Sequence, residues 1–179
     1  AEIRSYFGFG LAGVTGTITS ATLRLQGNPS FAMLLSPEGT ETFAVFDVST
    51  SLASLTAGTA GVAGFNDLGT GAQFGSLSIT AVSPNTVDIT LNALGLASLN
   101  SLGGGTAALG GALTTLAKSG NELVFNGAAS GQTRQLLLTT SGITPVPEPA
   151  SLASVALGLA GLGLLRRARQ APATSAKTK

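Results

Sequence analysis

Residues 21–26, ATLRLQ, and residues 87–92, VDITLN, decide the fold class of this chain. In both stretches apolar side chains alternate with polar ones, as where Arg24 separates Leu23 from Leu25. Successive side chains of a β-strand point to opposite faces of the sheet, so this alternation predicts strands with one buried face. Strands of this kind are typical of antiparallel sheets.

Similar stretches, bounded by glycine, proline or asparagine, recur through the first 144 residues. The expected strands lie at residues 7–11, 18–25, 42–48, 74–82, 87–92, 107–116, 122–128 and 134–140. About eight strands with one apolar face bury that face by pairing two sheets, so we predict an all-β fold, an antiparallel β-sandwich of jelly-roll type. In residues 92–102 the apolar spacing changes to three and four, which predicts one short helix with Asn92 as its N-cap.

The composition excludes several kinds of functional site. The chain has 179 residues and contains no cysteine, histidine or tryptophan. Thiolate and imidazole metal sites, disulfides and Ser-His-Asp triads are therefore excluded. Charged residues make up 9% of the chain, whereas soluble proteins have roughly 25%. The low charge and the 25 glycines favour an extracellular β protein.

The charge is divided unevenly along the chain. Residues 1–144 carry four basic and seven acidic side chains, whereas residues 145–179 carry five basic and one acidic. The chain is therefore expected to have two parts. The first part lacks the basic stripe that phosphate contacts require, so we expect no nucleic-acid partner.

The predicted domain organisation follows these differences. Residues 1–142 form the β-sandwich domain, 143–149 a proline-rich linker, 150–169 a hydrophobic helix with an arginine cluster, and 170–179 a disordered tail. The sequence begins at Ala1 without an initiator Met or an apolar export signal, so we expect a preceding N-terminal portion.

The C-terminal part has the pattern of a membrane segment. Residues 150–165 are uncharged and are followed by Arg166, Arg167 and Arg169. As a helix these residues would extend about 24 Å, slightly less than the roughly 30 Å of a bilayer core. A buried core helix is the alternative, but the stretch has no polar face. We predict a single transmembrane helix, with the basic cluster in the cytoplasm and residues 1–149 on the far side of the inner membrane.

The same region resembles a known sorting signal. Val146, Pro147, Glu148 and Pro149, then the apolar stretch, then the arginine cluster near the C terminus, are similar to the PEP-CTERM sorting domain of Gram-negative bacteria. The resemblance implies recognition by an exosortase, cleavage near Pro-Glu-Pro, and release to the cell surface or the exopolysaccharide matrix of a biofilm. The prolines favour an extended segment that a peptidase can reach. A passive single-pass anchor with a stiff stalk is the alternative.

A second resemblance concerns the β-domain. Residues 18–25, ITSATLRL, followed by residues 43–48, FAVFDV, resemble early strands of extracellular β-sandwich domains of the DNRLRE and carbohydrate-module type. This resemblance implies a fold rather than an activity.

Carboxylates give little indication of catalysis or metal binding. A glycosidase needs two carboxylates across a cleft, and Glu38 and Glu41 are the closest pair in sequence. Their neighbours Pro37 and Gly39 predict a turn with two solvated charges. Asn66 and Asp67 are weak candidates for a structural Ca²⁺. We therefore assign no catalytic residue, no metal ligand and no cofactor.

Exposed aromatic rings are the usual contacts for sugars. Phe7, Phe9, Phe43 and Phe125 fall on alternating positions and are expected in the core, whereas Phe65 and Phe74 fall in the glycine-rich stretch 49–73 or beside it and are predicted as exposed ligand contacts. Three classes of function follow. The first is a non-enzymatic structural or adhesive matrix protein, the second a carbohydrate-binding module for exopolysaccharide, and the third a polysaccharide hydrolase. The sequence favours the first.

Overall fold

The computed structural model describes residues 2–117, 121–125 and 132–142. Its strands are β1 (Ser5–Gly10), β2 (Thr17–Gln26), β3 (Leu34–Leu35), β4 (Thr40–Asp47), β5 (Gln73–Thr80), β6 (Thr86–Thr90), β7 (Thr106–Leu113), β8 (Leu123–Val124) and β9 (Arg134–Ser141). Its helices are α1 (Leu52–Thr56), α2 (Gly61–Asp67) and α3 (Ala93–Ser101). The predicted strands and the helix after Asn92 are present, except that the strand predicted at residues 122–128 is seen only as the two residues of β8, and residues 126–128 lie outside the described residues. The short strand β3 and the helices α1 and α2 were not predicted.

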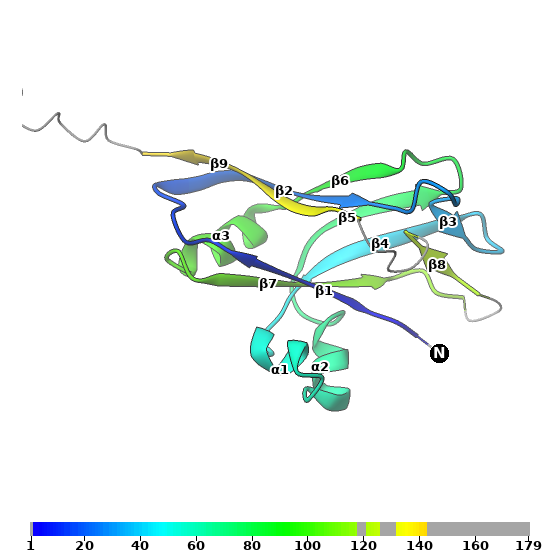
Figure 1. Cartoon of the computed structure of the whole chain (residues 1–179), viewed down its shortest axis with the longest axis horizontal. Helices are drawn as coiled ribbons and strands as arrows, with labels where there is room; N and C mark the ends of the chain where they lie inside the picture. Colours follow the sequence, from blue (N-terminus) through cyan, green and yellow to red (C-terminus); the bar gives the residue numbers. More distant parts are fainter. Residues whose placement is uncertain (1, 118–120, 126–131, 143–179) are drawn as a thin grey trace, which may run out of the picture. The chain divides into compact units, whose positions relative to one another are not determined.

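The strands form antiparallel sheets. The larger sheet has the order β1-β7-β4-β5 and the smaller one the order β6-β2-β9, while β3 pairs with β8 alone. Figure 1 shows β9, β2 and β6 in one layer and β1, β7 and β4 in the other. The antiparallel all-β fold is therefore confirmed. The jelly-roll type remains a prediction, and the predicted transmembrane helix lies outside the described residues.

The main core lies between the two sheets, as the alternation predicts. Leu23 and Ile89 of the smaller sheet are 0% and 1% exposed and belong to one cluster with Phe43 and Leu109 of the larger sheet. Between the inward residues of β2, Arg24 points outward and forms an ion pair of 2.7 Å with Asp88 of β6. The pattern of residues 21–26 thus gives one apolar and one polar face.

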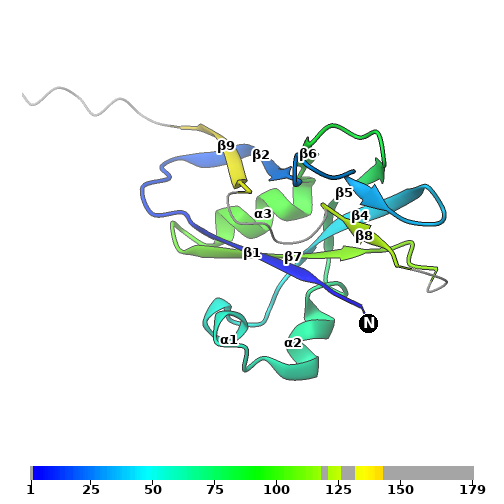
Figure 2. The ribbon, with the colours of Figure 1, turned by 45° about the vertical axis from the view of Figure 1, so that its right-hand side comes forward.

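The larger sheet is covered on both faces. Residues 43–46 of β4 are all buried, and Ala44, Phe46 and Ala112 form a second apolar cluster. Leu68, which ends α2, lies directly against Gly110 of β7. Figures 1 and 2 show α1 and α2 outside this sheet. The continuous apolar run in β4 follows from this double cover, because both sides of the strand need apolar side chains.

The helix α3 lies between the two layers at one end (Figure 2). The side chain of Asn92 caps it, accepting hydrogen bonds from the backbone N–H groups of Leu94 at 3.0 Å and Gly95 at 3.1 Å. This cap confirms the predicted helix start, because an Asn side chain satisfies N–H groups that lack partners within the helix. Leu99 of the helix is 2% exposed and belongs to the main core.

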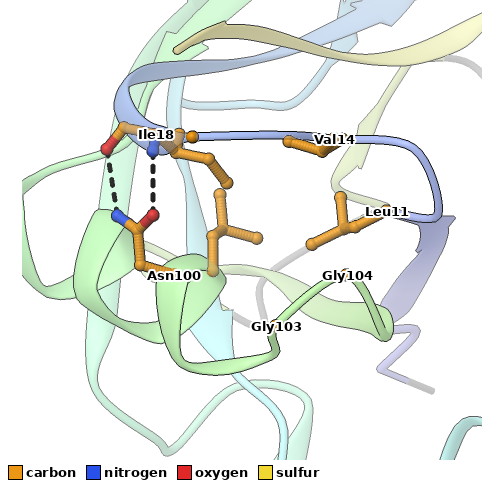
Figure 3. A pocket seen from close by; sticks show the side chains of 8 residues that line it. Leu11, Val14, Ile18, Asn100, Gly103 and Gly104 are labelled. Carbon is orange, nitrogen blue, oxygen red and sulfur yellow. Dashed lines mark hydrogen bonds between the residues drawn. The ribbon is translucent and has the colours of Figure 1, made fainter. Parts of the chain in front are cut away.

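Asn100 ties α3 to β2 (Figure 3). Its side-chain oxygen accepts a hydrogen bond from the backbone N–H of Ile18 at 2.8 Å, and its amide nitrogen donates one to the carbonyl of the same residue at 2.9 Å. The pairing of β2 with β9 shifts register between Ile18 and Ser20. The Asn100 side chain therefore supplies the hydrogen bonds of β2 where the strand pairing is irregular.

We expect Asn100→Ala to lower the free energy of unfolding by about 1.5 kcal/mol, because both backbone groups of Ile18 lose their partner. Urea denaturation followed by circular dichroism measures the change. Asn66→Ala is the matched control, since its side chain makes no hydrogen bond to a described residue, and it should cost only a few tenths of a kcal/mol. An equal loss of unfolding free energy in the two variants would show that the hydrogen bonds between Asn100 and Ile18 do not stabilise the domain.

Candidate functional site

Three glutamates meet at one end of the β-domain. Glu41 is the second residue of β4 and is 0% exposed, so the prediction that it is a solvated charge in a turn is wrong. One carboxylate oxygen from each of Glu38, Glu41 and Glu122 lies within 4.8 Å of the other two. Glu122 directly precedes β8, far from the other two in sequence, and so was not predicted to join them.

Hydroxyl groups hold the buried carboxylate. The Ser36 hydroxyl lies 2.6 Å from one Glu41 oxygen and 2.9 Å from a Glu38 oxygen, and the Thr115 hydroxyl donates to the other Glu41 oxygen. The carboxylate of Glu122 accepts from the backbone N–H of Ala117 at 3.0 Å. Among the described residues no basic side chain forms an ion pair with Glu41.

This arrangement bears on two chemistries. Carboxylate oxygens are the commonest side-chain ligands of Ca²⁺ in proteins, so Glu38, Glu41 and Glu122 have the donor atoms for a divalent cation. A glycosidase, in contrast, needs two carboxylates that both face the substrate. Glu41 has no exposed surface, so Glu38 and Glu41 do not form such a pair.

A cavity of about 350 Å³ lies beside the glutamates. This volume lies within the range of about 300 to 1,000 Å³ that is usual for small-molecule sites. Most of its lining is apolar, and Glu2 and Glu122 provide the carboxylates. The lining residues are Glu2, Ile3, Ser5, Phe43, Gly111, Leu113, Leu116, Glu122, Leu123, Val124 and Phe125. The cavity therefore combines an apolar surface with acceptors for hydrogen bonds.

Phe125, which lines this cavity, has an unusual backbone conformation. Its φ of 60° lies in the left-handed region, and among the described residues it is the one non-glycine residue with a positive φ. A bulky side chain in that conformation is strained, and strained residues cluster at functional sites. Its ring packs edge-on against Phe43, with the ring centroids 5.0 Å apart, and its backbone N–H bonds to the carbonyl of Met33 at 2.9 Å. These contacts hold the ring at the cavity wall.

The two phenylalanines predicted as ligand contacts lie elsewhere. Phe74 is 2% exposed in β5, so the prediction that it is exposed is wrong. Gln73 begins the strand earlier than the glycine-rich sequence suggested, and the alternation then turns Phe74 inward. Phe65 of α2 is half-buried, and the guanidinium of Arg4 stacks over its ring at 4.6 Å. One face of Phe65 is therefore already occupied.

Asn66 and Asp67, the weak calcium candidates, have other partners. The carbonyl of Asn66 accepts a hydrogen bond from the Arg4 guanidinium at 2.8 Å. The Asp67 carboxylate accepts from the backbone N–H of Thr50 at 2.7 Å and from the Ser49 hydroxyl at 3.0 Å. Through these hydrogen bonds, both residues hold α2 against other segments of the same chain.

We expect the stabilisation from Asp67 to depend on pH. Partial burial raises the pKa of this carboxyl, but the hydrogen bonds from Thr50 and Ser49 outweigh it and hold the pKa below its ordinary value of 3.8. A lowered pKa in the folded state means that the stabilisation is complete above the ordinary value and is lost as the pH falls through the folded one.

Asp67→Asn should therefore cost about 1 kcal/mol near pH 7, and wild type and variant should converge as the pH falls below about 4. Urea denaturation at a series of pH values measures both curves. A difference that stays constant down to pH 3 would show that the charge of Asp67 does not contribute.

The predicted sorting residues, Val146, Pro147, Glu148 and Pro149, lie outside the described residues, as do Arg166, Arg167 and Arg169. Within residues 2–117, 121–125 and 132–142, no helix has the length and apolar character needed to cross a membrane.

Comparison with known protein families matches residues 145–169 to the PEP-CTERM protein-sorting motif. The chain thus carries a region that matches this sorting motif, and the resemblance drawn from Pro147, Glu148 and the arginine cluster is confirmed. No curated protein and no solved structure matches the chain. The resemblance of residues 18–25 to DNRLRE-type domains remains a prediction.

Proposed function

We propose that this exported PEP-CTERM protein is a non-enzymatic structural or adhesive component of the cell surface or extracellular matrix. The sorting motif at residues 145–169 carries the proposal, because it supports export and sorting through an exosortase. The β-domain would be the part delivered, and the tail would be removed near Pro147 and Pro149. An association with exopolysaccharide belongs to the same proposal.

The charge pattern supports a membrane-anchored precursor. Arg166 directly follows the sixteen uncharged residues 150–165, and basic residues beside a membrane segment favour the cytoplasmic side. The β-domain then lies outside the cytoplasm, where the exosortase would act on the linker. A chain without cysteine is independent of the redox state of either compartment.

The test is the mass of the recovered protein. The chain is produced behind an export signal in two otherwise identical Gram-negative hosts, one with its exosortase and one with the exosortase gene deleted. Intact mass spectrometry of the culture supernatant and of the membrane fraction gives the C terminus. We expect a shortened protein outside the first host and the full chain in the membranes of the second. Full-length, membrane-bound protein in both hosts would favour the passive anchor.

The cavity beside Phe125 favours a second function, binding of carbohydrate from the exopolysaccharide. Sugars present apolar ring faces together with hydroxyl donors, and the cavity offers an aromatic wall together with the carboxylates of Glu2 and Glu122. The strained φ of Phe125 supports a functional role for this wall.

Isothermal titration of the full chain in detergent with purified exopolysaccharide of the producing strain tests the second function. Saturable binding that Phe125→Ala weakens about tenfold, a loss of about 1.4 kcal/mol, would support it. Phe31→Ala is the matched control, because Phe31 is 60% exposed and does not line the cavity. No heat of binding, or equal losses in the two variants, would exclude this cavity as the sugar site.

A further inference from the structure

The strand β9 forms one edge of the smaller sheet. It pairs with β2 on one side, and no described strand pairs with it on the other. An open strand edge presents backbone N–H and C=O groups that favour pairing with another strand. The β9 edge can therefore pair with a strand of complementary sequence.

The register shows which backbone groups of β9 are open. The N–H of Gln26 bonds to the carbonyl of Thr133 at 3.2 Å, and the Thr19 hydroxyl bonds to the carbonyl of Thr139. Along an antiparallel strand, successive residues direct their backbone groups to opposite sides. The N–H and C=O groups of Leu136 and Leu138 therefore point away from β2, where no described residue bonds to them.

Beyond Arg134, which begins β9, the edge lacks the usual protection against pairing. Edge strands are normally blocked by charged side chains, proline or bulges. Residues 135–141 of β9 read QLLLTTS and contain no charge, proline or glycine. The opposite edge of the same sheet, β6, is shorter and carries Asp88. Leu137 adds an exposed apolar side chain, 38% of which is open to solvent.

The sequence of β9 is self-complementary about Leu137. When two copies run antiparallel with Leu137 opposite Leu137, Leu136 of one copy lies opposite Leu138 of the other, and Arg134 lies opposite Thr140. Opposite residues then point to the same face, and the pairs with outward backbone groups become the hydrogen-bonded pairs. No like charges meet. A two-fold axis through Leu137 generates this arrangement, and two-fold dimers are the most frequent symmetric assemblies.

We propose that the β9 edge binds the β9 edge of a second copy of this chain, joining two smaller sheets into one. The proposal goes beyond the sorting function and does not depend on it, because pairing requires only the folded β-domain. For a matrix protein, such pairing would be a cross-link between copies.

A single cysteine tests the register directly. The chain has no cysteine, so Leu137→Cys introduces one defined thiol. At a non-hydrogen-bonded pair the Cα atoms lie about 4.5 Å apart, within the range for a disulfide. Under mild oxidation of the full chain in detergent, we expect Leu137→Cys to form a disulfide-linked dimer roughly ten times faster than Leu94→Cys. Leu94→Cys is the matched control, because it also replaces an exposed leucine by cysteine but lies in α3. Equal rates would overturn the register.

A charge at the same position gives the complementary test. Leu137→Lys places two ammonium groups opposite each other in the dimer, whereas the monomer gains only one exposed charge. Sedimentation of the full chain in detergent should show the wild type associating and Leu137→Lys associating roughly tenfold more weakly, with Leu94→Lys like the wild type. A monomeric wild type, or equal association of all three, would overturn the proposal. The sorting experiment is not affected by either result.

Discussion

Replacing Pro147 and Glu148 together by alanine is expected to abolish processing in the host that has its exosortase. The full chain should then replace the shortened protein, with a fall in the processed fraction of roughly tenfold or more. A loss of only about 1.4 kcal/mol in transition-state stabilisation already slows a reaction tenfold. The two residues lie in the matched motif, so this variant changes the motif and leaves the β-domain intact.

The physical reason is the shape and charge of the linker. Pro147 and Pro149 fix φ and carry no N–H, which favours an extended segment with few internal hydrogen bonds. Glu148 is the one acidic residue in 145–179, so it provides a recognisable charge. The variant removes the charge and the proline beside it, so the segment has more conformational freedom and its ordering costs more entropy on binding.

The matched control is Pro172→Ala with Lys177→Ala, which also removes one proline and one charge but lies beyond the motif. Intact mass of the supernatant and membrane fractions measures both variants. The control should be processed like the wild type. If the motif variant were shortened as efficiently as the control, recognition would not depend on Pro-Glu-Pro.

The second large effect is expected at Gly110. Gly110→Ala should lower the free energy of unfolding by about 3 kcal/mol, at the upper end of the cost of overpacking. A Cβ atom there would lie 2.5 Å from the carbonyl oxygen of Leu68 and 2.9 Å from its Cα. These are backbone atoms at the end of α2, so no side chain can rotate away, and α2 must shift from the sheet.

Gly10→Ala is the control for this change. Gly10 also lies in a strand of the larger sheet, but a Cβ atom there would have nothing within 4 Å. Its variant should therefore differ from the wild type by less than about 0.5 kcal/mol. Urea denaturation of both variants measures the difference. Equal stabilities would show that α2 does not pack on β7 as closely as the structure has it.

The elements that alternate regularly could be predicted from the sequence. Leu23, Leu25 and Ile89 are buried because one face of their strands meets the opposite sheet, and Asn92 caps a helix because its side chain can reach free N–H groups. These features depend on neighbours in the sequence, so a local pattern was enough.

The helices α1 and α2 could not be predicted in the same way. Residues 52–67 contain several alanines and glycines, and glycine lowers helix propensity. One signal was present, because the Ser51 side chain accepts a hydrogen bond from the Ser54 N–H and caps α1. Packing on the outer face of β4 and β7 stabilises the two helices, and that contact is not local.

The glutamate cluster shows a similar limit. Glu41 lies on the same face of β4 as the buried residues Phe43 and Val45, so the strand alternation indicated that Glu41 points inward. The nearby turn residue Gly39 instead favoured the interpretation that Glu41 belongs to the turn. Thr115 and Glu122 are more than 70 residues further along the chain, and only the folded sheets bring them to Glu41. A single sequence gives no direct sign of such a meeting.

The pairing of β2 with β9 also determines when the domain can fold. Thr17 lies opposite Ser141, so the smaller sheet joins the second strand of the described residues to the last of them. Contacts that are so distant in sequence form slowly, because the closure of long loops costs entropy before any pairing energy is gained. If the chain is exported N terminus first, as the proposed function implies, the smaller sheet cannot be completed until residue 141 has crossed the membrane, and the sorting motif begins at residue 145. On the proposed route to the cell surface, the domain therefore completes its fold only shortly before the sorting motif follows.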